Sequence, residues 1–445
     1  MAQAAQHGET GVYDLIGVGF GPSNLALAIA VTEHNAEQAD DAFVSARFLE
    51  RQATFGWHRG MLLDDATMQV SFLKDLVTLR NPASRYSFLC YLQDRDRLVD
   101  FINHKSLFPL RLEFHDYLEW AAAKVAHLVD WGSEVVEIEP VLHDGIVAYL
   151  DVTTGSGVTY RTRNVVLGTG LLPRLPAGIT ASDRVWHSQQ LLTRVEEMDG
   201  AEPSRFVVVG AGQSAAEVTS FLHQRFPTAE VCAVFSRYGY SPADDSPFAN
   251  RIFDPAAVDD FYDAPSDVKT MLLEYHGNTN YSVVDSALIE DLYRRAYQEK
   301  VTGRARLRLL NVSRVRELAD TPDGLDVTIE SLVTGEASEM RADVIVYSTG
   351  YLPADPYTML GEVGAFCPAD EAGRPRIGRD YRVASALELE CGVYLQGGTE
   401  HSHGLSSSLL SNSAVRAGEI LGSIVQHRTD WELSTLSDVD FAPLR

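Results

Sequence analysis

Two stretches of the chain share one pattern: a short apolar run, a glycine-rich turn, and a longer run with apolar residues at helical spacing. The first is YDLIGVG from Tyr13, continued by PSNLALAIAVTEH. The second is RFVVVGAG from Arg205, continued by QSAAEVTSFLHQ. Apolar runs of this length are typical of buried parallel strands, and the spacing after each turn is typical of a helix. Each stretch therefore predicts a strand, a tight turn and a returning helix.

Other apolar runs in the chain predict further strands that accompany these two units. ARFLE ends on Glu50, and EVCAVFSR follows the second predicted helix. RNVVLGTG (163–170) and DVIVYSTGY (343–351) both end in a Thr-Gly turn and bracket the second unit. The sequence therefore predicts an α/β fold of two doubly wound, Rossmann-like dinucleotide-binding domains, the second inserted into the first, with a small, mostly helical substrate region.

The predicted boundaries follow from these runs. The first domain is expected at 11–190 and 341–430, and the second at 191–340, with a helical insert at about 242–300 where the alternation of strand and helix stops. Residues 413–427 have the apolar spacing of a closing helix, and 431–445 are expected to form a loosely ordered acidic tail.

The first glycine turn carries residues suited to a pyrophosphate. Glycine permits φ > 0 and a close backbone approach to a phosphate at the N-terminus of a helix. Pro22 suits a first helical turn, and Asn24 has a side chain able to contact a phosphate or cap the helix. Glu50, at the end of the next strand, suits a ribose hydroxyl. A strand-to-helix turn without any nucleotide is the alternative. The candidate cofactor-binding residues here are Gly17, Gly19, Gly21, Pro22, Ser23, Asn24 and Glu50.

The second turn matches G-x-G-x-x-A, with Ala215 in the last position. The strand that follows ends on Ser236 and Arg237 rather than on an acid. An acid would repel a 2′-phosphate, whereas Ser and Arg suit it, so NADPH is favoured over NADH. An exposed surface arginine is the alternative for Arg237. The candidate residues of this loop are Gly210, Gly212, Gln213, Ser214, Ser236 and Arg237.

Two dinucleotide loops in one chain indicate a flavoprotein oxidoreductase, with FAD on the first domain and NADPH on the second. The four cysteines, Cys90, Cys232, Cys367 and Cys391, are far apart in sequence, so no dithiol is spaced for disulfide reduction. Dioxygen is therefore the expected electron acceptor.

Composition and net charge argue against some classes of binding partner. The 445 residues carry a formal net charge of −25, and no basic stretch interleaved with aromatics offsets it, so nucleic acid is not expected as a partner. No apolar run is long enough for a membrane span, and the N-terminus lacks the pattern of a secretory signal. We expect a cytoplasmic protein that does not bind a membrane.

Several longer blocks resemble a known family. They include WHRGMLLDDATMQVSFLKDLVTLRNPASRYSFLCYL, RLEFHDYLEWA, GAGQSAAE, DDSPFANRIFDP, NTNYSVVD and GGTEHSHGLSSSLLSN, in that order. Together they resemble the flavin-dependent N-hydroxylating monooxygenases, and most of all the microbial L-ornithine N5-monooxygenases of siderophore and related peptide pathways. The resemblance runs from about Tyr13 to the closing helix.

The resemblance implies roles for particular residues. Trp57, His58 and Gln69 would lie along the flavin, and Lys74, Asn250 and Asn280 would hold the α-carboxylate and α-amino groups of the amino acid. Leu405, Ser406 and Ser407 would line the flavin and substrate side, with Ser407 a candidate substrate contact. Taken alone, Lys74 also fits an amphipathic-helix lysine reaching solvent, and the two asparagines fit turn chemistry.

The resemblance also implies the reaction. NADPH would reduce FAD, dioxygen would add to give a C4a-hydroperoxyflavin, and the neutral δ-amine of L-ornithine would take one oxygen atom to give N5-hydroxyornithine. No side chain is expected to be the nucleophile. The family further implies a homo-tetramer. L-Lysine as substrate, and a Baeyer–Villiger or sulfide oxygenase, are the alternatives.

The EHSH segment carries two histidines two residues apart, His401 and His403. Alternate positions share a side only on a strand, and no other ligand cluster accompanies them. No metal site is predicted.

Overall fold

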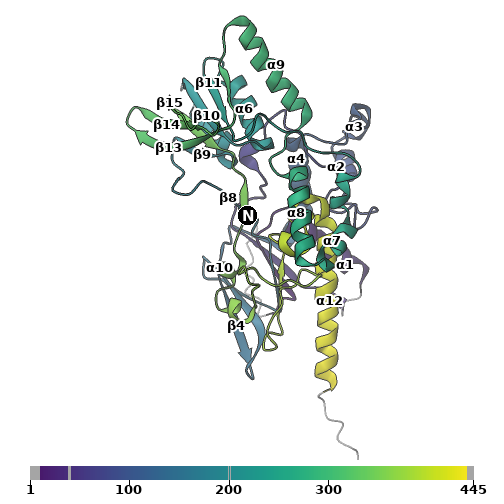
Figure 1. Cartoon of the computed structure of the whole chain (residues 1–445). Helices are drawn as coiled ribbons and strands as arrows, with labels where there is room; N and C mark the ends of the chain where they lie inside the picture. Colours follow the sequence, from purple (N-terminus) through teal and green to yellow (C-terminus); the bar gives the residue numbers. More distant parts are fainter. Residues whose placement is uncertain (1–10, 39–41, 199, 201, 438–445) are drawn as a thin grey trace, which may run out of the picture.

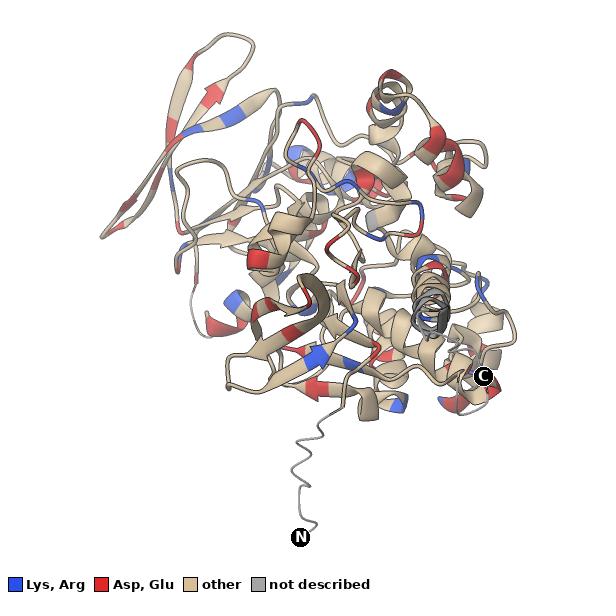
Figure 2. Cartoon of the chain, turned by 90° about the horizontal axis from the view of Figure 1, so that it is seen from below, with Lys and Arg blue, Asp and Glu red and all other residues tan. Residues whose placement is uncertain are grey.

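The computed structural model describes residues 11–38, 42–198, 200 and 202–437. Figure 1 shows two lobes, one holding β10, β11 and α6 and the other holding α1, β4 and the long helix α12. Figure 2 shows acidic and basic residues scattered over many helices, strands and loops rather than gathered in one place, so the acidic excess does not by itself mark a binding site. In the described ranges, no helix is long and apolar enough to cross a membrane.

A five-stranded parallel sheet forms the centre of the first lobe. Its order is β18 (Gly392–Leu395), β7 (Asn164–Leu167), β1 (Leu15–Val18), β2 (Ala46–Glu50) and β3 (Val129–Trp131). All four neighbouring pairs are parallel. Parallel strands buried on both faces need helices on both sides, which explains their nearly continuous apolar runs.

Helix α1 (Pro22–Glu37) follows β1 and packs against α12 (Ser413–Ser437). Residues 24–31 of α1 are all buried, so the helix is enclosed on every side rather than amphipathic. Helix α12 continues past the expected end of the closing helix, and residues 431–437, expected in a loose tail, are helical. The rest of that predicted tail, 438–445, lies outside the described residues.

A second five-stranded parallel sheet forms the other lobe. Its order is β12 (Leu307–Leu310), β11 (Glu230–Val234), β10 (Arg205–Val209), β16 (Val344–Tyr347) and β9 (Val185–His187). Helix α6 (Gln213–Arg225) follows β10 and packs on α9 (Ser286–Thr302).

The second sheet corrects the predicted boundaries. Strands β9 and β16 were expected in the first domain, but both hydrogen-bond within the second sheet. The prediction placed β16 with β7 because both strands end in a Thr-Gly turn. A turn pattern, however, does not determine which sheet a parallel strand joins. Two chain segments connect the lobes. One contains β8 (Leu171–Pro173) and the other contains β17 (Tyr351–Pro353), and these two strands pair antiparallel.

The remaining elements surround these sheets. Two antiparallel sheets consist of β4 (Val135–His143), β5 (Ile146–Thr154) and β6 (Thr159–Thr162), and of β13 (Ser313–Thr321), β14 (Gly324–Ser331) and β15 (Ala337–Ala342). The other α-helices are α2 (Phe88–Asp94), α3 (Leu98–His104), α4 (Arg111–Lys124), α5 (Leu191–Glu197), α7 (Pro255–Asp263), α8 (Ser266–Asn280), α10 (Pro356–Leu360) and α11 (Glu400–His403). The segment 242–300, predicted to be mostly helical, contains α7, α8 and most of α9.

Candidate cofactor and substrate site

A cleft of about 2600 Å³ lies where the two lobes meet. Its walls include both glycine turns, the Trp57–His58 pair, Lys74 and the 310 helix Ala249–Phe253. The fold thus brings to one cavity segments that are far apart in sequence.

The first glycine turn has the shape of a phosphate cradle. Gly19 has φ +81°, and a Cβ there would lie 2.6 Å from the carbonyl oxygen of Gly168. A Cβ on Gly17 would collide with the ring of Phe48, whereas one on Gly21 would meet nothing within 4 Å. Gly21 is the N-cap of α1, with no side chain capping the helix. Uncapped N–H groups facing open space at a helix N-terminus are suited to an anion.

The backbone of the first glycine turn holds the acidic residue at the end of β2. Glu50 is 6% exposed, and its Oε2 accepts from the backbone N–H of Phe20 at 2.6 Å while its Oε1 accepts from that of Gln52 at 2.8 Å. Each oxygen keeps further acceptor capacity toward the cleft. A ribose hydroxyl therefore fits here.

Asn24 and Gly17 lie behind the turn rather than in the cleft wall. The Asn24 amide donates to the carbonyl of Gly19 at 2.7 Å and to that of Val18 at 3.3 Å, so it does not cap α1. In this structure the Asn24 amide serves the turn, and its contact with a phosphate stays a prediction. Its amide holds the turn in shape, which a sequence pattern does not distinguish from ligand contact. Pro22 and Ser23 do line the cleft.

The second glycine turn repeats the cradle in the other lobe. Gly210 has φ +144°, and a Cβ there would lie 2.5 Å from the carbonyl oxygen of Ser348. Gly212 is the N-cap of α6, again without a side-chain cap, and Ser214 follows in the cleft wall. Gln213 spans the turn, because its Nε2 donates to Glu217 at 2.9 Å and its Oε1 accepts from the N–H of Asp285 at 2.8 Å.

Ser236 and Arg237 line the same cleft just beyond β11. Arg237 donates one N–H to the carbonyl of Ser282 at 2.9 Å, and within the described ranges no carboxylate lies within ion-pair distance of it. Its remaining donors are free to meet a phosphate, which agrees with the preference for NADPH.

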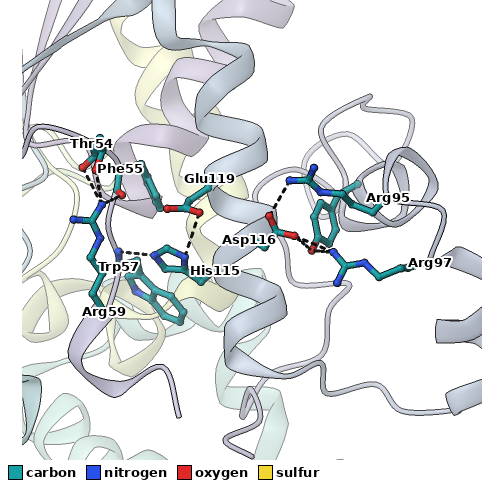
Figure 3. Close-up of polar contacts among 10 residues, drawn as sticks. Thr54, Phe55, Trp57, Arg59, Arg95, Arg97, His115, Asp116 and Glu119 are labelled. Atoms are coloured by element: carbon teal, nitrogen blue, oxygen red, sulfur yellow. Dashed lines mark hydrogen bonds and ion pairs between the residues drawn. The ribbon is translucent and has the colours of Figure 1, made fainter. Parts of the chain in front are cut away.

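The Trp57–His58 pair forms part of the wall between the two turns. Their rings meet edge to face at 4.8 Å, and His58 has the left-handed φ of 50°. Burial, helped by the Arg111 cation, lowers the pKa of His58 to about 4, so the ring is neutral at neutral pH. Figure 3 shows the Trp57 backbone N–H pointing to His115 of α4, at 3.4 Å from Nε2. Gln69 also lines the cleft.

Lys74 reaches the cleft from an irregular turn rather than from an amphipathic helix. The neighbouring Asp75 carboxylate, 3% exposed, accepts from the N–H groups of Val77, Thr78 and Phe88 and so fixes this turn against the start of α2. The Lys74 ammonium lies 5.4 Å from the centroid of the Phe253 ring. Partial burial lowers its pKa, opposed by the Asp254 charge. In the described part of the chain it has no carboxylate within 4 Å, so its charge is available to a ligand.

Asn250 faces the same space from the 310 helix that contains Phe253. Its Nδ2 donates to the carbonyls of Asp245 and Ser246 at 2.8 and 3.2 Å, which is the turn chemistry considered from the sequence. These bonds direct only the amide nitrogen, and the amide oxygen is left to accept from an ammonium. Asn280 is the last residue of α8, and its side chain lies outside what the structure describes.

The segment after α11 carries three of the predicted contacts. Leu405, Ser406 and Ser407 are buried and are not among the residues that line the cleft, so their contact with flavin and substrate stays a prediction. Ser411 lines the cleft, and the buried Oγ atoms of Ser407 and Ser411 both have no hydrogen-bond partner in the described chain. Two short 310 helices, Leu405–Ser408 and Leu410–Asn412, turn the chain between these serines. The serine-rich pattern does not reveal which hydroxyl faces the cavity.

The two histidines of the EHSH segment serve the fold. His401 contacts the carbonyl of Pro375 at 3.0 Å, and His403 contacts that of Arg379 at 3.1 Å while stacking on Tyr381. Among the residues that the structure describes, no group of three or more His, Cys, Asp or Glu is placed to hold a metal ion.

Comparison with known proteins identifies the family. The sequence model described as L-lysine 6-monooxygenase/L-ornithine 5-monooxygenase matches residues 11–353. An L-ornithine N(5)-monooxygenase of Burkholderia cepacia is 42% identical over 405 residues, covering 88% of this chain and 90% of that protein. The chain belongs to this family.

Solved structures of the family agree. An ornithine N-hydroxylase of Kutzneria sp. 744, described with reduced FAD, NADP⁺ and L-ornithine, matches with a TM-score of 0.90 at 48% identity, over 94% of this chain and 100% of that one. An L-lysine 6-monooxygenase of Pseudomonas syringae matches with a TM-score of 0.83 at 31% identity, over 93% of this chain and 99% of that one. The chain is thus a flavin-dependent N-monooxygenase that uses FAD and NADPH, and its two cradles fit these dinucleotides.

Proposed function

We propose that this enzyme hydroxylates the side-chain amine of L-ornithine to N5-hydroxyornithine, with FAD on the first glycine turn and NADPH on the second. The observation that carries the proposal is the Lys74 ammonium, which faces the cleft shared by both turns and has no carboxylate partner among the residues that the structure describes. An α-amino acid brings the carboxylate that this position lacks. The product would serve siderophore or related peptide synthesis.

The protein side chains bind and orient the substrate. Lys74 would hold the α-carboxylate, and the amide oxygen of Asn250 would accept from the α-ammonium. We also propose Asn280 for the α-ammonium, and Ser411 rather than Ser407 as the serine that faces the substrate. With both α-groups fixed, only the side-chain amine is left free for reaction, and such positioning contributes much of an enzyme's rate enhancement.

The bound flavin supplies the hydride acceptor and the activation of dioxygen. Overall, the amine, NADPH, a proton and dioxygen give the hydroxylamine, NADP⁺ and water. An alkylammonium has a pKa of about 10.4, so the substrate must lose a proton before the N–O bond forms. The partial burial that lowers the pKa of Lys74 also disfavours a charged substrate amine in this part of the cleft, and the Lys74 cation itself disfavours a second cation nearby, so both favour the neutral amine.

The test is substrate turnover by the purified chain with FAD, NADPH and oxygen. Hydroxylated product is measured by mass spectrometry for ornithine and for lysine, together with NADPH consumed and hydrogen peroxide released. We expect one hydroxylamine per NADPH with ornithine, and a lower kcat/KM for lysine, since one methylene is worth about 1–3 kcal/mol. NADPH oxidation without hydroxylamine from either amino acid would contradict the proposal.

The assembly and location of the enzyme are separate proposals. We propose a homo-tetramer, as the family resemblance implies, and a cytoplasmic location, as the sequence pattern of the chain indicates. Light scattering of the purified protein measures the mass of the assembly, and a mass of one or two chains would contradict the tetramer. Fractionation of the producing cells tests the location.

A further inference from the structure

Arg416, on α12, is a fully buried cation on which the nearby Glu419 charge acts only from beyond ion-pair distance. It is 1% exposed, and within the described ranges no carboxylate oxygen lies within 4 Å of it. Glu419, nearly one turn further on, is already held by Arg379 through bonds of 3.1 and 2.9 Å. A buried charge is costly unless it is paired, and the described residues place no carboxylate beside this guanidinium, so an anionic ligand would stabilise it.

Arg416 is hydrogen-bonded to Ser23, in the first turn of α1, both directly and through Gln396. Nε donates to Oε1 of Gln396 at 2.9 Å, and Nη2 donates to Oγ of Ser23 at 3.0 Å. The Gln396 amide in turn donates to the backbone carbonyl of Ser23 at 3.2 Å, which closes a triangle of hydrogen bonds. Nη1 donates to the carbonyl of Ser407. All these acceptors are neutral.

This arrangement fixes the direction of the Ser23 hydroxyl. A guanidinium can only donate, so Ser23 Oγ accepts from Arg416 and its own proton is left for another acceptor. Ser23 lines the cleft in the first turn of α1, where no side chain caps the helix and no acidic residue stands. The hydroxyl, the free N–H groups and the charge behind them all favour an anion at this place.

We propose that Arg416 is a positioning residue for the FAD pyrophosphate, which it stabilises by its charge and by holding the Ser23 hydroxyl as a donor. The role rests on FAD binding at the first glycine turn. A purely structural role, in which Arg416 only fastens the Ser407 carbonyl, is the alternative that an experiment must separate.

The experiment compares Arg416→Gln, which removes the charge but keeps donors, with Arg416→Lys, which keeps the charge. Arg379→Gln is the matched control, since it breaks an arginine contact to the same helix away from the turn. The full chain is prepared without FAD, its thermal midpoint is measured, and FAD is titrated at several NaCl concentrations. We expect Arg416→Gln to raise the Kd for FAD at least tenfold and to flatten its dependence on salt. Arg416→Lys should recover part of the affinity, and Arg379→Gln should bind FAD as the wild type does.

Two results separate the alternatives. If Arg416→Gln and Arg416→Lys lower the thermal midpoint of the FAD-free chain equally and bind FAD with wild-type affinity and salt dependence, the role is structural and the proposal is wrong. Should Arg416→Gln not fold, Ser23→Ala tests the same path: a raised Kd for FAD with an unchanged FAD-free midpoint supports it, and an unchanged Kd overturns it. A wild-type chain that does not bind FAD would instead contradict the cofactor assignment.

Discussion

Arg111, at the start of α4, and Glu217, on α6, form a two-pronged ion pair across the lobes, with N···O distances of 2.9 and 2.7 Å. The side chain of Glu217 is 4% exposed and that of Arg111 13% exposed. Glu217 also accepts from Gln213 of the second glycine turn, so one carboxylate links the first lobe to the NADPH loop. Arg111 in addition contributes to the low pKa of His58.

We therefore expect Glu217→Gln to affect both stability and NADPH binding. Leaving Arg111 buried without its anion should cost about 3 kcal/mol, and a displaced Gln213 should raise the KM for NADPH. Urea unfolding and steady-state kinetics measure the two effects. The control is Asp151→Asn, which breaks a more exposed pair with Arg161 and should cost less than about 1 kcal/mol. If the two variants lost the same free energy of unfolding, the buried pair would not contribute more to stability than the exposed pair, and the prediction would be wrong.

Lys74→Met tests the carboxylate clamp. Losing a charge-assisted contact of about 1.5–3 kcal/mol should raise the KM for ornithine by roughly ten- to a hundredfold or more, with a smaller change in kcat. Lys300→Met, on the exposed surface of α9, is the matched control and should leave the KM unchanged. An unaltered KM in Lys74→Met would show that the substrate carboxylate binds elsewhere.

Two glycines of the first turn should respond differently to the same added methyl group. Gly19→Ala places a Cβ at positive φ and 2.6 Å from a backbone carbonyl, so we expect a loss of about 1–3 kcal/mol of stability. A Cβ on Gly21 meets only open space, so the FAD-free chain should keep its stability while the pyrophosphate is excluded. Thermal unfolding and FAD titration of both variants check this. Normal FAD affinity in Gly21→Ala would place the cofactor elsewhere.

Burial of His403 is expected to make the folded chain less stable in acid. The residue is 1% exposed, and burial lowers its pKa from 6.5 to about 4. Between these pH values the unfolded chain binds a proton that the folded chain does not, so the free energy of unfolding falls as the pH falls from about 6.5 to about 4, by up to about 3 kcal/mol. Urea unfolding across this range should give a flatter profile for His403→Gln. Exposed His143→Gln should keep the wild-type slope, and a similar flattening there would contradict the assignment.

The local patterns of the sequence were sufficient for much of the fold. The two apolar strands, their glycine turns and the returning helices were predicted because each feature depends on neighbouring residues: burial of a strand, positive φ at a turn, and spacing along a helix. The same local chemistry indicated two dinucleotides, and the family resemblance indicated Lys74 and Asn250, which the structure brings to one cleft.

Only the tertiary structure decided which parts of the chain meet. It assigned the strands 185–187 and 344–347 to the second sheet, turned Asn24 inward, and placed Ser411 in the cleft wall. It also joined Arg416 to Ser23, which are 393 residues apart in sequence. These outcomes depend on strand pairing and on the directions in which packed segments face one another, and long-range contacts of this kind leave no periodic signal in the sequence of either segment.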